Sequence, residues 1–164
     1  MEPWEVWVRS TWLSRLVIDQ GWIWPTFEIL HYFGLTLLIC SVGLFDLRVL
    51  GMARSISPMA LHRLIPWGVA GFAINLLTGV AFFSGFPEQY AYNQAAYFKL
   101  GFMAIAAVNL AVFYLTSFRS LQLLPSGADA PLSAKIFTGI SLCSWLGVLV
   151  AGRFLTFFRP PFFH

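Results

Sequence analysis

Several ionisable side chains lie within apolar stretches of this sequence, and four of them lie toward the same ends of these stretches: Glu28, His31, Lys99 and Arg153. A charge at the centre of a membrane span costs about 2.5–3.5 kcal/mol, so such groups usually face a protein interior and have a partner. Glu28 and His31 are three residues apart, which places both side chains on one helix face. An imidazole can ligate haem iron, and cations can pair with haem propionates. The residue types therefore predict a cofactor site.

The elements that carry these residues are four apolar stretches. Each exceeds the roughly 20 residues needed to cross a hydrocarbon core of about 30 Å. Short polar segments separate them, and no linker is long enough to divide the chain into two domains. The predicted fold is an all-α, integral membrane four-helix antiparallel bundle over residues 25–158, followed by a C-terminal tail, 159–164. The predicted spans are 26–49, 58–84, 95–117 and 132–158.

Antiparallel connectivity brings the four ionisable groups to a similar depth. Each lies within one or two helical turns of the membrane surface nearest the chain termini, at 1.5 Å of rise per residue. The segment between the second and third spans adds tyrosines and an amide at this level, Tyr90, Asn93 and Tyr97. Gly34, one turn after His31, is expected to leave a notch for a porphyrin edge. The expected cofactor-binding residues are His31, Lys99, Arg153, Gly34, Asn93 and Tyr97.

The composition of the 164 residues excludes several protein classes. Apolar and aromatic residues make up 59% of the chain and charged residues 10%, with a mean hydropathy of +0.74. Soluble domains carry roughly 25% charged residues, so an ordinary cytosolic enzyme, a disordered tail and a secreted disulfide scaffold are all excluded. The net charge is only +3 and no basic stripe is present, which argues against a nucleic-acid partner. Cys40 and Cys143 lie in apolar stretches and are expected to be packing residues.

Residues 1–24 form a separate, Trp-rich segment without the features of a signal peptide. Tryptophan is enriched at the level of lipid headgroups, so we expect an interfacial helix that contacts the bilayer and ends before Pro25. With Lys99 and Arg153 set aside, five lysines and arginines lie toward the side away from the termini and three lie toward the side of the termini. This distribution favours termini outside the cytoplasm. The tryptophans are Trp4, Trp7, Trp12, Trp22 and Trp24.

Two runs of residues carry a family resemblance, Glu28-Ile-Leu-His31-Tyr-Phe-Gly34 and Asp46-Leu-Arg48-Val-Leu-Gly51. With them, the chain from about residue 25 to 158 resembles an uncharacterised family of small bacterial inner-membrane proteins. In layout, that family is similar to small b-type membrane cytochromes and to CopD-like copper-resistance proteins. The resemblance implies a haem-containing four-helix subunit of the bacterial inner (cytoplasmic) membrane, with a copper site near the haem and an oligomeric assembly; the charge distribution then places the termini in the periplasm.

The leading hypothesis is a haem b-binding membrane protein with a redox or electron-transfer role and a quinol or another redox partner. His31 is the expected axial ligand, and the sixth ligand is left open between Lys99, His164, another protomer and a small molecule. Copper would use Glu28, His31 and His164. Two alternatives remain: a transporter or ion-conducting subunit that uses the four ionisable groups, and a structural subunit. Asp46 is expected to form a local ion pair or helix cap. Whether the protein is an enzyme is left open.

Overall fold

The computed structural model describes residues 2–125 and 127–158, and the regular elements in these ranges are all helices. Four helical stretches are long and apolar enough to cross a membrane: Ile23–Val49, Pro58–Gly85, Gln94–Thr116 and Leu132–Phe154. The second stretch consists of a short and a long helix, Pro58–His62 and Ile65–Gly85. The predicted all-α, multi-pass membrane architecture is therefore confirmed. The helices are α1 (Pro3–Ser10), α2 (Trp12–Asp19), α3 (Ile23–Val49), α4 (Pro58–His62), α5 (Ile65–Gly85), α6 (Pro87–Ala91), α7 (Gln94–Thr116), α8 (Phe118–Gln122) and α9 (Leu132–Phe154).

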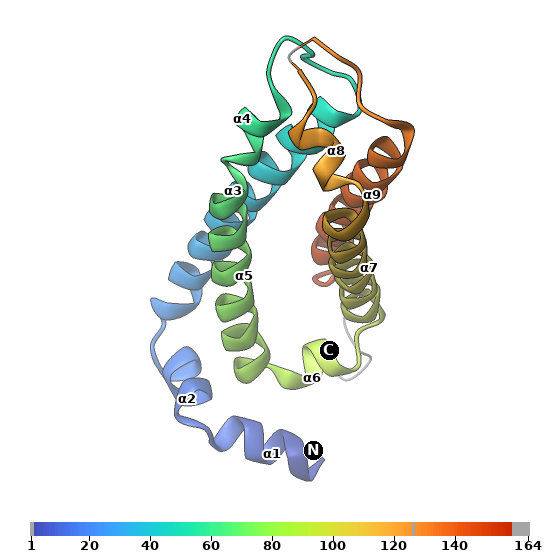
Figure 1. Cartoon of the computed structure of the whole chain (residues 1–164). Coiled ribbons are helices and arrows are strands. Elements are labelled where there is room, and N and C mark those ends of the chain that lie inside the picture. Colours follow the sequence, from blue (N-terminus) through green and yellow to red (C-terminus); the bar gives the residue numbers. More distant parts are fainter. Residues whose placement is uncertain (1, 126, 159–164) are drawn as a thin grey trace.

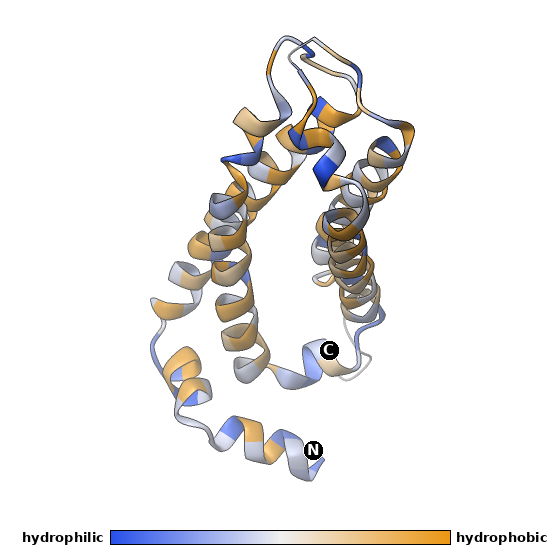
Figure 2. Cartoon of the chain, viewed as in Figure 1, coloured by the Kyte–Doolittle hydropathy of each residue, from blue (hydrophilic) through white to orange (hydrophobic). Residues whose placement is uncertain are grey.

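The long helices pack as two hairpins, α3 with α5 and α7 with α9 (Figure 1). The main direct contacts between the hairpins join α3 to α9 and α4 to α8. The hairpins converge where segments 50–57 and 117–131 connect the helices, which we call the loop end. They diverge toward the opposite end, where α3 and α7 begin, which we call the open end. Apolar residues predominate along all four long helices, as expected for helices in contact with lipid (Figure 2).

Glycines bring the backbones of α3 and α5 into contact. A Cβ atom on Gly34 would lie 2.8 Å from the carbonyl oxygen of Gly71, and one on Gly71 would lie 2.8 Å from the backbone nitrogen of Leu38. Small residues at such contacts let membrane helices approach closely. The expectation that Gly34 leaves a notch for a porphyrin is therefore wrong, because α5 covers that position.

The substitution Gly71→Ala is expected to destabilise the protein by about 1–3 kcal/mol, because the added methyl group must push two helix backbones apart. Gly79→Ala is the matched control on the same helix, since nothing lies within 4 Å of a Cβ at Gly79. Unfolding of both variants in detergent measures the difference. Equal stability of the two variants would contradict the close packing of α3 on α5.

A buried arginine holds the loop end together. Arg48 is 1% exposed and donates hydrogen bonds to three backbone carbonyl oxygens: that of Ile56 through Nε, and those of Arg54 (3.0 Å) and Ala128 (3.5 Å) through Nη2. These carbonyls belong to the segment that follows α3 and to the segment that precedes α9. Arg48 therefore ties the two hairpins together at this end.

The N-terminal segment contains two helices instead of the single one expected. Thr11 separates them, and its hydroxyl accepts a hydrogen bond from the backbone N–H of Ser14, which caps α2. Helix α3 then begins at Ile23, so Pro25 lies inside its first turn. Proline is tolerated there because the first N–H groups of a helix have no intrahelical partner. The N-terminal helices do end before Pro25, at Asp19, but the first span begins three residues earlier than the predicted residue 26.

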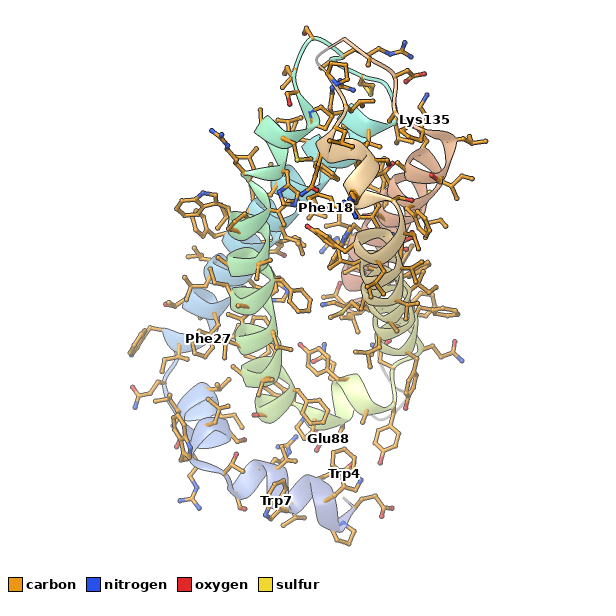
Figure 3. All side chains as sticks on the ribbon, viewed as in Figure 1. Trp4, Trp7, Phe27, Glu88, Phe118 and Lys135 are labelled. Carbon is orange, nitrogen blue, oxygen red and sulfur yellow. The ribbon has the colours of Figure 1, made fainter. Side chains whose placement is uncertain are left out.

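Helix α1 is anchored to α6 at the open end. Arg9 donates two hydrogen bonds to the carboxylate of Glu88, at 2.9 and 2.8 Å. Burial acts to raise the pKa of Glu88, but the hydrogen bonds and charge of Arg9 outweigh it and hold the pKa below its usual value. The ring of Trp4 stacks at 6.4 Å on that of Phe83. Figure 3 shows Trp4 and Glu88 at this junction, and these contacts fix α1 across the open end.

Candidate functional site

The imidazole of His31 is held between α3 and α5. Its Nδ1 lies 2.7 Å from the hydroxyl oxygen of Thr78, and its ring packs 5.5 Å from the ring of Phe82. The Thr78 hydroxyl also lies 2.8 Å from the carbonyl oxygen of Ile74 and 3.2 Å from that of Asn75. Carbonyl oxygens only accept hydrogen bonds, so they take the single hydroxyl hydrogen of Thr78.

It follows that Nδ1 of His31 carries a hydrogen and donates it to Thr78. This hydrogen-bond network assigns the tautomer in which Nε2 holds the lone pair. Among the described residues, Nε2 has no hydrogen-bond partner. Histidines that bind metals commonly donate the other ring N–H to a fixed acceptor, which orients the ring and raises the basicity of the ligating nitrogen. The arrangement of His31 and Thr78 has this form.

Lys99 approaches the same site from the second hairpin. It lies in the first part of α7, close enough to His31 for its charge to act on the imidazole. None of the ion pairs in the described part of the chain includes Lys99. A cation at membrane depth is expected to have an anionic or polar partner. The site therefore offers a positive charge to a ligand that carries an anionic group.

Glu28 lies at the exposed edge of the site. Its Oε1 accepts a hydrogen bond from the indole N–H of Trp24 at 3.1 Å. Burial, and after it the charge of Glu28, raise the pKa of Tyr90 to about 12. Tyr90 on α6 therefore keeps its phenolic hydrogen at neutral pH. The structure thus brings together groups from α3, α6 and α7 at the open end.

Arg153 is not joined to these groups by any hydrogen bond or ion pair in residues 2–125 and 127–158. It is exposed near the end of α9, and its guanidinium lies 5.2 Å from the ring centroid of Phe157. This cation–π contact is local to the end of α9. No direct contact among the described residues therefore supports the predicted proximity of Arg153 to His31.

Asn93 and Tyr97 have structural roles instead of the expected cofactor contacts. The side-chain oxygen of Asn93 accepts from the backbone N–H of Ala95 at 2.9 Å and caps α7, and its amide donates to the carbonyl of Leu155 at 3.0 Å. The hydroxyl of Tyr97 donates to the carbonyl of Ala91. The side-chain oxygen and nitrogen of Asn93 thus both have hydrogen-bond partners within the protein, as buried polar atoms usually do.

A copper site is incomplete within the described residues. No group of three or more His, Cys, Asp or Glu side chains in that part of the chain could hold a metal ion. Glu28 and His31 are two of the expected copper ligands, and the third, His164, lies outside the described residues. His62 lies at the loop end, where its Nε2 is 2.8 Å from the hydroxyl of Tyr114.

Thr78, which contacts His31, is the residue of the candidate site that sequence analysis did not select. A signal was present, because Gly68, Gly71, Asn75 and Thr78 follow one another at helical spacing along one face of α5. Pairing this face with Gly34 on an antiparallel helix places Thr78 close to His31.

Comparison of the chain with known protein families, curated proteins and solved structures yields no match. The case for a function therefore rests on the chemistry of the site.

Proposed function

We propose that the chain is a haem b-binding membrane protein in which Nε2 of His31 ligates the iron. The observation that carries this proposal is the hydrogen bond between Nδ1 and Thr78, which leaves Nε2 with a lone pair and no partner among the described residues. A bound haem supplies one-electron redox chemistry. Lys99, a cation at membrane depth with no ion pair in the described residues, supplies the charge that a propionate needs.

The residues around His31 fit a haem better than a closed metal site. A haem iron needs one or two axial ligands from the protein, whereas a closed site for a metal ion needs about four. His31 provides one ligand, and His62 is too distant to provide another because it lies at the opposite end of the hairpins. The sixth ligand would come from Lys99, His164, a second protomer or a small molecule. Arg153, at the same end of the molecule, is the candidate second partner for the propionates.

We further propose a bacterial inner-membrane location with periplasmic termini, a homo-oligomeric assembly and a quinol as the redox partner. Exposed Trp7, Trp12 and Trp22 in the N-terminal segment suit the headgroup region at that surface. A quinol dissolved in the bilayer would reach a haem at the open end without leaving the hydrocarbon. A copper ion beside the haem would depend on Glu28 and His164.

The visible absorption spectrum of protein purified after haem-replete expression tests the proposal. We expect a Soret band and a pyridine haemochrome of b type, with about one haem per chain. Metal analysis of the same sample measures iron and copper separately. Protein that is colourless and retains no iron would overturn the haem proposal. A flux in liposomes that depends on Glu28 would then favour the transporter alternative.

Thr78→Val tests the hydrogen bond that fixes His31. We expect haem affinity to fall about 10–100-fold and the reduction potential to shift, because the ring loses the acceptor that orients it. Haem titration and spectroelectrochemistry measure the two effects. Thr36→Val is the matched control, since the exposed Thr36 hydroxyl bonds only to the carbonyl of Tyr32 within its own helix. Identical behaviour of both variants would remove the assigned role of Thr78.

A further inference from the structure

A buried carboxyl group lies where the two hairpins meet. Asp46 on α3 is 3% exposed, and its Oδ2 has no hydrogen-bond partner. It faces α9, where the Ser141 hydroxyl lies beside it. The sequence-based expectation of an ion pair or helix cap for Asp46 is wrong for the described residues, because no ion pair there includes it.

A small void adjoins this carboxyl group. Its volume is about 20 Å³, and its walls are otherwise apolar. This volume has room for one water-sized molecule. The walls come from α3 and α9 alone, so the void and Asp46 mark the joint between the two hairpins. Besides Asp46, the lining residues are Ile39, Val42, Gly43, Leu142, Trp145 and Leu146.

No neighbouring charge compensates an ionised Asp46. On α3, Arg48 is engaged with the loop carbonyls, and on α9, Lys135 is paired with Asp129 at 2.7 Å. On α4, His62 is bonded to Tyr114. Helix α5 carries no charged residue. A buried carboxylate without a cation or sufficient donors is strongly disfavoured relative to the neutral acid.

We propose that Asp46 is a proton-binding site that closes the joint between α3 and α9. Closure transfers the carboxylate from water to the interface, where it takes up one proton from the loop-side solution and becomes a neutral carboxylic acid. Opening returns the same proton to water and restores the carboxylate. The closed joint binds the additional proton, so closure is favoured at low pH and is lost as the pH rises. This inference is independent of haem binding.

Infrared spectroscopy of the full-length protein tests the protonation state. We expect a carbonyl stretch of a protonated carboxylic acid at neutral pH that disappears in Asp46→Asn and changes frequency in Ser141→Ala. Asp129→Asn, an exposed and ion-paired aspartate at the same end, is the control and should leave the band unchanged. Absence of the band from the wild type, or its persistence in Asp46→Asn, would overturn the proposal.

The distance between the two native cysteines reports on closure of the joint, because Cys40 lies on α3 and Cys143 on α9. Both are exposed and can be labelled. With spin labels on both, we expect the distance distribution of the wild type to broaden and lengthen as the pH rises. Asp46→Asn cannot ionise, so its distribution should stay short. A distribution that does not change with pH in the wild type, or that changes equally in Asp46→Asn, would contradict the coupling of proton binding to closure.

Discussion

His31→Ala is expected to yield a folded membrane protein that has lost its haem. Removal of the acceptor behind a metal-binding histidine costs about 10–100-fold in affinity, so removal of the ligand itself should cost more than about 100-fold. The Soret band of the purified variant should be largely absent. Absorption per milligram of protein and haem titration of the apoprotein measure the effect. Added imidazole should restore part of the band by occupying the vacated position.

Two controls separate ligation from folding. His62→Ala removes a histidine from the loop end, where Nε2 is bonded to Tyr114, and should leave the haem spectrum unchanged. Circular dichroism of His31→Ala should show the helical content of the wild type, because the backbone hydrogen bonds of α3 do not depend on this side chain. An unchanged haem spectrum in His31→Ala would eliminate His31 as the ligand.

Arg48→Met is expected to destabilise the protein by about 1–3 kcal/mol, the cost of leaving backbone carbonyl oxygens without their hydrogen-bond donor. The carbonyl oxygens of Ile56, Arg54 and Ala128 would each lose a charged donor. Arg48→Lys should recover only part of the loss, because one ammonium group cannot reproduce the forked geometry of a guanidinium. Unfolding in detergent measures the three proteins side by side.

Arg63→Met is the control for this prediction, since Arg63 is an exposed arginine near the same end of the molecule. Its stability should stay within about 0.5 kcal/mol of the wild type. The folded fraction of Arg48→Met should still bind haem, because the arginine is at the end opposite His31. Equal stability of Arg48→Met and Arg63→Met would show that Arg48 does not hold the loop end together.

We expect His31→Ala to affect haem binding and Arg48→Met to affect stability, because the two ends of the molecule are built differently. At the loop end, Arg48 and the ion pair of Arg54 with Asp129, at 3.6 Å, tie the connecting segments to each other. At the open end, the hairpins diverge and α1 and α6 cross below them (Figure 1). Stability is therefore expected to depend on the loop end, and ligand binding on the open end.

Sequence analysis predicted the spans well and the packing faces poorly. The spans follow from length and hydropathy, because a helix in lipid must satisfy its own backbone hydrogen bonds over about 20 apolar residues. The packing faces of the helices do not follow from length and hydropathy, because lipid is as apolar as the protein interior and each long helix is apolar on every side. Gly34 illustrates the difference: its helical position was evident, but the sequence did not show which of the other spans would cover it.

By itself, the sequence determined an all-α protein with four membrane-spanning helices, and it placed a few polar residues near one surface. The tertiary structure decided what those residues contact. In the folded chain Asn93 caps a helix, Nδ1 of His31 bonds to Thr78, and Arg153 lies beside Phe157. The physical reason is that helical periodicity fixes the direction of each side chain from its own axis. Only the packing of one helix against another decides whether that direction leads to a partner, to lipid or to a ligand.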